Sequence, residues 1–212
     1  KAFTPSCHLR TTDEMMASFT SWMSQEEAKE LVITNTNVKH SLGSSKYNER
    51  RKECEEGLLA LKGAMPNIEQ LADVTPEEFE LHKNLITDTT VQKRIKHVVY
   101  ECDRVKKSAE ALKTNEIAKF GEFMNASHDS LQYEYEVTCP ELDFVVQEGR
   151  KIKGVLGIRM TGAGFGGCTV SLVREAAIPT FIEQVGAEYT EKTGLKADFY
   201  IAEIGDGAHR VM

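Results

Sequence analysis

Several features that define common protein classes are missing from this sequence. It has five cysteines among 212 residues, and no two of them form a C-x-x-C pair, so neither a zinc ribbon nor a thioredoxin-type motif can form locally. None of its six histidines lies in an H-E-x-x-H arrangement, and we therefore expect no metal site made from this chain alone. An odd number of scattered cysteines is typical of free thiols in a reducing compartment, which predicts a cytoplasmic protein.

Long hydrophobic runs and an excess of basic charge are also missing. No stretch approaches the roughly 18 consecutive apolar residues of a membrane-spanning helix, and no apolar segment follows Lys1, so we expect neither a membrane span nor a signal peptide. The chain has 26 Lys and Arg against 33 Asp and Glu, which argues against a nucleic-acid-binding surface. Hydrophobic residues make up 41% of the chain, enough to form a folded core.

The hydrophobic pattern predicts an α+β fold. Apolar residues recur at helical spacing from residue 45 to about residue 153, and the last sixty residues change to short apolar runs broken by glycine. The clearest helix start is the run TPEE at residues 75–78, in which the threonine can cap the helix and the proline fits its first turn. The expected helices cover residues 13–23, 45–65, 75–85, 91–113, 115–133, 140–152 and 176–193, and the expected strands cover residues 31–33, 155–160, 168–173 and 197–204. Helices on one face of an antiparallel sheet would accommodate this order.

A glycine-rich loop between two expected strands is the most specific feature. It consists of Thr161, Gly162, Ala163, Gly164, Phe165, Gly166 and Gly167. Glycine permits positive φ and close approach of the backbone to a ligand, so the loop is either a flexible hairpin connection or a nest of N–H groups that faces an anion. A strand-like run follows the loop where a dinucleotide-binding site needs a helix. Cys168 stands where a P-loop needs lysine, and no protein-kinase motif follows.

Residues 159–169 (RMTGAGFGGCT) closely resemble the third signature of the GHMP small-molecule kinases, and the phenylalanine in the loop resembles the galactokinases within that family. Three further segments support this resemblance and extend it over about residues 31 to 212: residues 35–51 with their YNER run, residues 94–101 (RIKHVVYE), and residues 127–143 (SHDSL followed by YEVTCPELD). The resemblance implies a GHMP kinase C-terminal domain with a ferredoxin-like antiparallel sheet and helices packed on one face.

The resemblance also implies how the chain is divided. Residues 45–212 would form the C-terminal domain, and residues 1–44, a poorly matched segment with one strand, would belong to the N-terminal domain of an intact kinase. Galactokinases carry their sugar-clamping segment, their Gly/Ser-rich phosphate loop and their catalytic aspartate further upstream, and we find none of these here. We therefore assign no catalytic residue and no metal ligand to this chain, and we expect it to be inactive by itself.

The function that the resemblance implies is ATP-dependent phosphorylation of galactose at its anomeric hydroxyl, with Mg²⁺, in company with the missing N-terminal half. Tyr47 would hydrogen-bond the sugar, unless it lies on a helix face with its hydroxyl in solvent. The loop from Thr161 to Gly167 would line the active-site cleft, with Phe165 packing the loop. We expect His97 and His128 to be hydrogen-bonded structural histidines rather than bases.

Two other functions remain open from the sequence. The intact protein could be another GHMP kinase, of mevalonate or homoserine type, or a sugar- or nucleotide-binding module without catalysis. A half-enzyme would expose the face that contacts its other half, so we also expect self-association, which light scattering would test.

Overall fold

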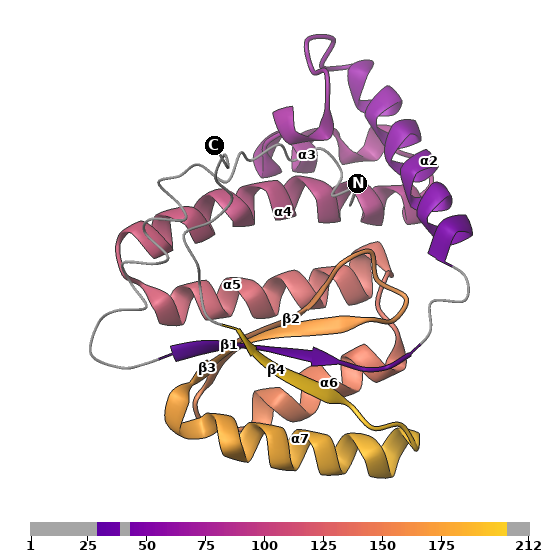
Figure 1. The fold of residues 1–212 in the computed structure, drawn as a ribbon. Coiled ribbons are helices and arrows are strands. Elements are labelled where there is room, and N and C mark those ends of the chain that lie inside the picture. Colours follow the sequence, from indigo (N-terminus) through magenta and orange to yellow (C-terminus); the bar gives the residue numbers. More distant parts are fainter. Residues whose placement is uncertain (1–28, 39–42, 203–212) are drawn as a thin grey trace, which may run out of the picture.

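A four-stranded antiparallel sheet lies at the centre of the molecule (Figure 1). The computed structural model describes residues 29–38 and 43–202, so the helix expected at residues 13–23 lies outside the described residues. The strand order is β2-β3-β1-β4, and every neighbouring pair is antiparallel. The strands are β1 (Lys29–Asn35), β2 (Val155–Thr161), β3 (Cys168–Arg174) and β4 (Asp198–Ala202).

The helices begin and end close to the residues that the sequence indicates. Thr75 caps α3: its hydroxyl accepts from the Glu78 amide at 3.2 Å, and the Glu78 carboxylate accepts from the Thr75 amide at 2.9 Å. Gly194, with φ 72°, ends α7 as a left-handed cap. The helices are α2 (Gly43–Lys62), α3 (Pro76–His82), α4 (Thr89–Lys113), α5 (Ile117–Ser130), α6 (Pro140–Lys151) and α7 (Ile178–Thr193), and a π-helical turn (Leu131–Tyr135) extends α5.

Apart from helices α2 to α5, which lie between β1 and α6 in the chain, the order β1–α6–β2–β3–α7–β4 is the β-α-β-β-α-β arrangement of a ferredoxin-like unit. The predicted α+β class and the antiparallel sheet are therefore confirmed. Helices α6 and α7 cover one face of the sheet, where Val32, Ile158 and Val173 pack with Phe181 and Val185 in one buried cluster.

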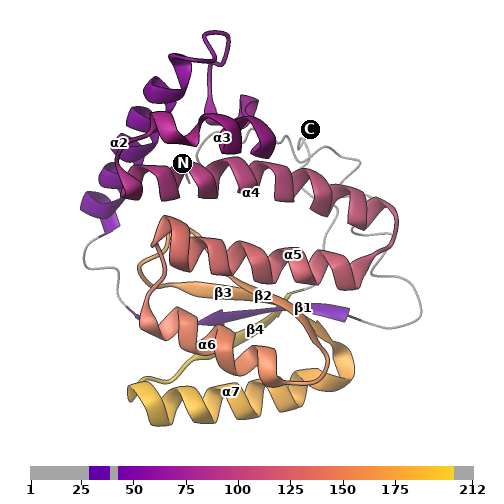
Figure 2. The same cartoon turned by 180° about the vertical axis from the view of Figure 1, so that it is seen from behind.

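The expectation of helices on one face holds for α6 and α7 only. Helix α5, with α4 beyond it, lies on the other side of the sheet (Figures 1 and 2), where Leu172 packs with Ile117 and Met124. The reason lies in β3, because Leu172 and Val173 point to opposite faces and both are fully buried. A third apolar cluster, which includes Phe79 and Ile95, joins α2, α3 and α4 above this layer.

The boundary expected at residue 44 does not divide the described structure. Strand β1 lies between β3 and β4 and pairs with both, Thr34 opposite Thr169 on one side and opposite Phe199 on the other. It is therefore a central strand of the same sheet. No helix in the described part of the chain has the length and apolar character to cross a membrane.

Candidate active site

The glycine loop joins the end of β2 to the start of β3 and has an unusual backbone. The φ angle is positive at Gly162 (88°), Gly164 (86°), Gly166 and Gly167, and also at Phe165 (59°). It is not positive at Ala163, so a side chain at that position causes no left-handed strain. The sign of φ alternates over residues 162–164, which is the pattern of a backbone nest whose N–H groups converge on an anion.

The loop is fixed at two points. The Phe165 amide donates to the Val137 carbonyl at 2.7 Å, and the amide and hydroxyl of Thr36 both donate to the Gly167 carbonyl, at 3.0 and 2.7 Å. The Phe165 ring packs against a buried cluster that contains Leu142 and Met160. The expectation that Phe165 packs the loop is confirmed. The loop is held by hydrogen bonds and packing and is not a flexible hairpin connection.

Gly164 and Gly162 make a matched pair for testing this geometry. A Cβ at Gly164 would lie 2.0 Å from the Val137 carbonyl oxygen, whereas a Cβ at Gly162 would meet nothing within 4 Å. Both substitutions carry the left-handed penalty of roughly 1–2 kcal/mol, and Gly164→Ala adds a backbone clash. We expect urea denaturation to show Gly164→Ala less stable than Gly162→Ala by about 1–3 kcal/mol. Equal stabilities would show that the loop is not held against Val137.

The turn that holds the loop also holds α2. Arg50 of α2 donates from Nε to the Tyr135 carbonyl at 2.6 Å and from Nη2 to the Glu136 carbonyl at 3.1 Å, and Glu136 has the left-handed values φ 54° and ψ 53°. Val137, the next residue, accepts from the loop. Half-buried Tyr47 lies one turn before Arg50 on α2. The structure thus connects both parts of the candidate site, the helix of Tyr47 and the glycine loop, to residues 135–137.

Two of the sequence motifs meet at this turn in a way that the sequence analysis missed. The Arg94, His97 and Glu101 side chains lie on one face of α4 and reach the end of α5. Arg94 donates to the Glu134 carbonyl at 2.6 Å, His97 Nδ1 lies 2.8 Å from the Ser130 hydroxyl, and the Ser127 hydroxyl donates to Glu101 at 2.5 Å. The i, i+3, i+7 spacing of polar residues on a long helix was the available signal.

Helix α5 also covers the free edge of β2. The Ile158 amide donates to Asn125 Oδ1 at 3.0 Å, and the Met160 amide donates to His128 Nδ1 at 3.2 Å. The approach is close because Gly121 and Gly157 face each other, and a Cβ on either would lie 2.2 or 2.4 Å from backbone atoms. These contacts satisfy donors that an edge strand would otherwise expose. They confirm His128 as a hydrogen-bonded structural histidine.

Burial shifts the pKa of several side chains on the elements around the candidate site. Burial raises the pKa of the Cys168 thiol, and it raises that of Cys139 to about 11, so neither thiol offers a thiolate nucleophile at neutral pH. Burial lowers the pKa of His97 to about 4. Burial lowers the pKa of Arg159, whose Nη1 lies 3.7 Å from Glu101 Oε1. Within residues 29–38 and 43–202, no three His, Cys, Asp or Glu side chains gather as a metal site.

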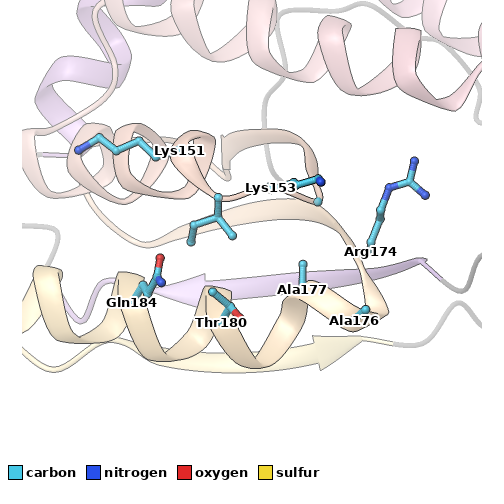
Figure 3. Close-up of a pocket in the computed structure, with 9 residues that line it drawn as sticks. Lys151, Lys153, Arg174, Ala176, Ala177, Thr180 and Gln184 are labelled. Atoms are coloured by element: carbon cyan, nitrogen blue, oxygen red, sulfur yellow. The ribbon is translucent and has the colours of Figure 1, made fainter.

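A surface hollow of about 500 Å³ lies at the opposite end of the sheet. It is lined by Lys151, Lys153 and Arg174, among others, near the start of α7 (Figure 3). The charged ends of Lys151 and Arg174 point away from each other in this view, and Lys151 is paired with Glu148 at 2.6 Å. The basic side chains around the hollow do not converge on a common ligand position, so we place the candidate site at the glycine loop.

The family described as "GHMP kinases C terminal" matches residues 108–191, from the last turns of α4 almost to the end of α7. Residues 108–191 thus match the C-terminal domain of the GHMP kinases. The galactokinase of Bacillus subtilis (strain 168) is 50% identical over 181 residues, and that of Fusobacterium nucleatum subsp. nucleatum is 52% identical over 181 residues. Each match covers 85% of this chain and 46% of the relative. The chain thus spans about half the length of the curated relatives it matches.

Solved structures agree with this assignment. The Lactococcus lactis galactokinase complexed with galactose superimposes with a TM-score of 0.82 at 44% identity, over 86% of this chain and 47% of that one. The L. major mevalonate kinase in complex with R-mevalonate gives a TM-score of 0.51 at 20% identity, which shows the shared fold alone. The GHMP kinase C-terminal domain and the resemblance to galactokinases are therefore confirmed.

Proposed function

We propose that this chain is the C-terminal half of a galactokinase, which transfers a phosphoryl group from ATP to the anomeric hydroxyl of galactose. The observation that carries the proposal is the match at about half identity to the C-terminal halves of galactokinases. The built glycine loop supports it, because phosphoryl transfer depends mostly on positioning and on stabilising charge. The catalytic aspartate and the main phosphate loop would lie in the other half.

The loop offers backbone donors to a ligand. Gly162 and Ala163 are exposed, and no residue in the described part of the chain accepts a hydrogen bond from their amides. Such donors fit a phosphate or a sugar hydroxyl. Mg²⁺ is usually held by one or two carboxylates together with substrate phosphates and waters, and we assign those carboxylates to the other half.

The chain's own contributions would be binding and orientation. We assign to Tyr47 a hydrogen bond to galactose, and to the loop from Thr161 to Gly167 one wall of the active-site cleft. Arg50 would hold both in register, because it anchors the helix of Tyr47 to the turn that binds the loop. A cytoplasmic location, and self-association of the isolated chain, stay predictions.

A chimera tests the proposal directly. The matched C-terminal portion of the Bacillus subtilis galactokinase is replaced by the matched portion of this chain, and ATP consumption is followed with galactose, mevalonate and homoserine. We expect turnover with galactose, and none from this chain alone. A chimera that prefers mevalonate or homoserine would indicate another GHMP kinase, and saturable sugar binding without turnover would indicate a binding module.

The coding DNA upstream of Lys1 gives an independent test. An in-frame sugar clamp, Gly/Ser-rich phosphate loop and catalytic aspartate are expected there. Unrelated sequence in that position would contradict the proposal even if the chimera is active.

A further inference from the structure

We propose that the buried pair His128–Asp143 positions the glycine loop, and that the direction of its hydrogen bonds governs the rate of phosphoryl transfer. His128 is 1% exposed and lies at the end of α5, and Asp143 lies in the first turn of α6. Neither is a catalytic residue, since both act through the strand and the turn that hold the loop. The kinetic part of this inference rests on the proposed function, whereas the structural part does not.

The hydrogen bonds around His128 fix its tautomer. The Met160 amide donates to Nδ1 at 3.2 Å, so Nδ1 is an acceptor and the proton of the neutral ring is on Nε2. Nε2 lies 3.3 Å from Asp143 Oδ1. This is the approach of an ion pair and not a hydrogen bond of good geometry, and both buried atoms lack a hydrogen-bond partner among the described residues. Each atom therefore depends on the other.

The second carboxylate oxygen of Asp143 accepts hydrogen bonds from two other side chains. Oδ2 accepts from Gln132 Nε2 at 2.8 Å and from the Thr138 hydroxyl at 3.2 Å. A carboxylate accepts at both oxygens, which suits donors on both sides. Asp143 thus faces the ring N–H of His128 with one oxygen and accepts from the Gln132 amide and the Thr138 hydroxyl with the other.

The His128–Asp143 pair connects the two segments that hold the glycine loop: the end of β2 and the turn at residues 137 and 138. On one side His128 holds Met160, the residue before Thr161 at the end of β2. On the other side Asp143 holds Thr138, the residue after Val137, whose carbonyl accepts from Phe165 in the loop. A shift between these supports moves the loop, and displacements of about 1 Å far from the chemistry can cost a rate about a hundredfold.

Asp143→Asn tests the proposal because it keeps the shape and changes the polarity. If the oxygen of the introduced asparagine faces His128, its amide group faces Gln132, which must turn its own amide over to accept from it. If the asparagine is rotated, two donors meet at His128 instead. We expect kcat of the intact protein to fall about tenfold or more, with KM for ATP and galactose changed by less than about twofold.

Gln132→Glu provides the compensating change. In the double variant, the asparagine introduced by Asp143→Asn accepts from His128 and donates to the carboxylate introduced by Gln132→Glu, so the ring N–H and the asparagine amide each meet an acceptor. We expect the double variant to recover most of the lost kcat, whereas Gln132→Glu alone is impaired because two carboxylates face each other. Asp129→Asn is the matched control, because Asp129 is 47% exposed and pairs with Arg150 on the surface.

Amide hydrogen exchange provides a readout that does not need activity. In Asp143→Asn we expect faster exchange over residues 160–167 and unchanged exchange in α7. If the wild type does not phosphorylate galactose but exchange responds in this way, the proposed function fails and the positioning role stands. A lower melting temperature with unchanged kcat and unchanged loop exchange would overturn the positioning role, as would a double variant that recovers nothing.

Discussion

Replacing Arg94 by methionine should lower the free energy of unfolding by about 3–5 kcal/mol, the usual cost of breaking a buried ion pair from one side. The Arg94 side chain is 2% exposed. Its guanidinium donates to Glu53 at 3.1 Å, to the Glu134 carbonyl at 2.6 Å and to Glu136 at 2.7 Å. Methionine replaces much of the apolar stem, so the expected loss comes from the acceptors left without their donor. Urea denaturation measures it.

Lys52→Met is the control for this measurement. Lys52 forms a helical ion pair with Glu56 at 3.6 Å, and its side chain is 78% exposed, so its removal should cost less than about 1 kcal/mol. Arg94→Lys should remain destabilised, because one ammonium cannot reach three separated acceptors as a planar guanidinium does. If Arg94→Met were as stable as Lys52→Met, the three contacts would not contribute to the fold.

Helix and strand positions followed from the sequence because their signals are local. The cap at Thr75 and the glycine at residue 194 mark helix ends through contacts within one turn. The glycine loop could be predicted for the same reason, since positive φ is a property of single residues. Ala163 fits the same rule, because its φ is not positive and its Cβ therefore causes no left-handed strain.

Pairing between distant segments could not be predicted by these means. Strand β1 pairs with β3 more than a hundred residues away, and nothing in the local pattern of residues 31–33 indicates a central strand. The helical layer of α4 and α5 was missed for a related reason, since a buried strand such as β3 reads as an apolar run whichever helices cover it.

The site shows the same division. The sequence placed the motif residues on helices, but their contacts with one another depend on how α4 packs on α5. Gly121 and Gly157 were unremarkable in the sequence, although each leaves the space that lets α5 lie against the edge of β2. The contacts of Arg50 with residues 135 and 136 likewise span 85 and 86 positions. Local reasoning thus identified the parts of the candidate site and not the turn that connects them.

The second large effect is a pH dependence that comes from His97. The ring is 3% exposed, and burial lowers its pKa to about 4, an effect that Glu101 partly opposes and that Arg94, Arg104 and Arg159 reinforce. Between these two pKa values, the unfolded chain, with a histidine pKa of about 6.5, binds a proton that the folded chain does not. Stability is therefore lost as the pH falls below about 6.5, by about 2 kcal/mol at pH 5 relative to pH 8.

His97→Asn removes this term and keeps a polar atom near the Ser130 hydroxyl. The stability advantage of the wild type over the variant, measured by urea denaturation at each pH, should shrink by about 2 kcal/mol between pH 8 and pH 5. Ser130→Ala is the control: it removes the contact with His97 Nδ1 at 2.8 Å but keeps the buried ring, so its stability should follow the slope of the wild type. Parallel pH curves for the wild type and His97→Asn would mean that the folded protein protonates His97 as readily as the unfolded chain does. The α4–α5 contact would then tolerate a charge on the ring that stacks on Tyr135 with centroids 4.5 Å apart.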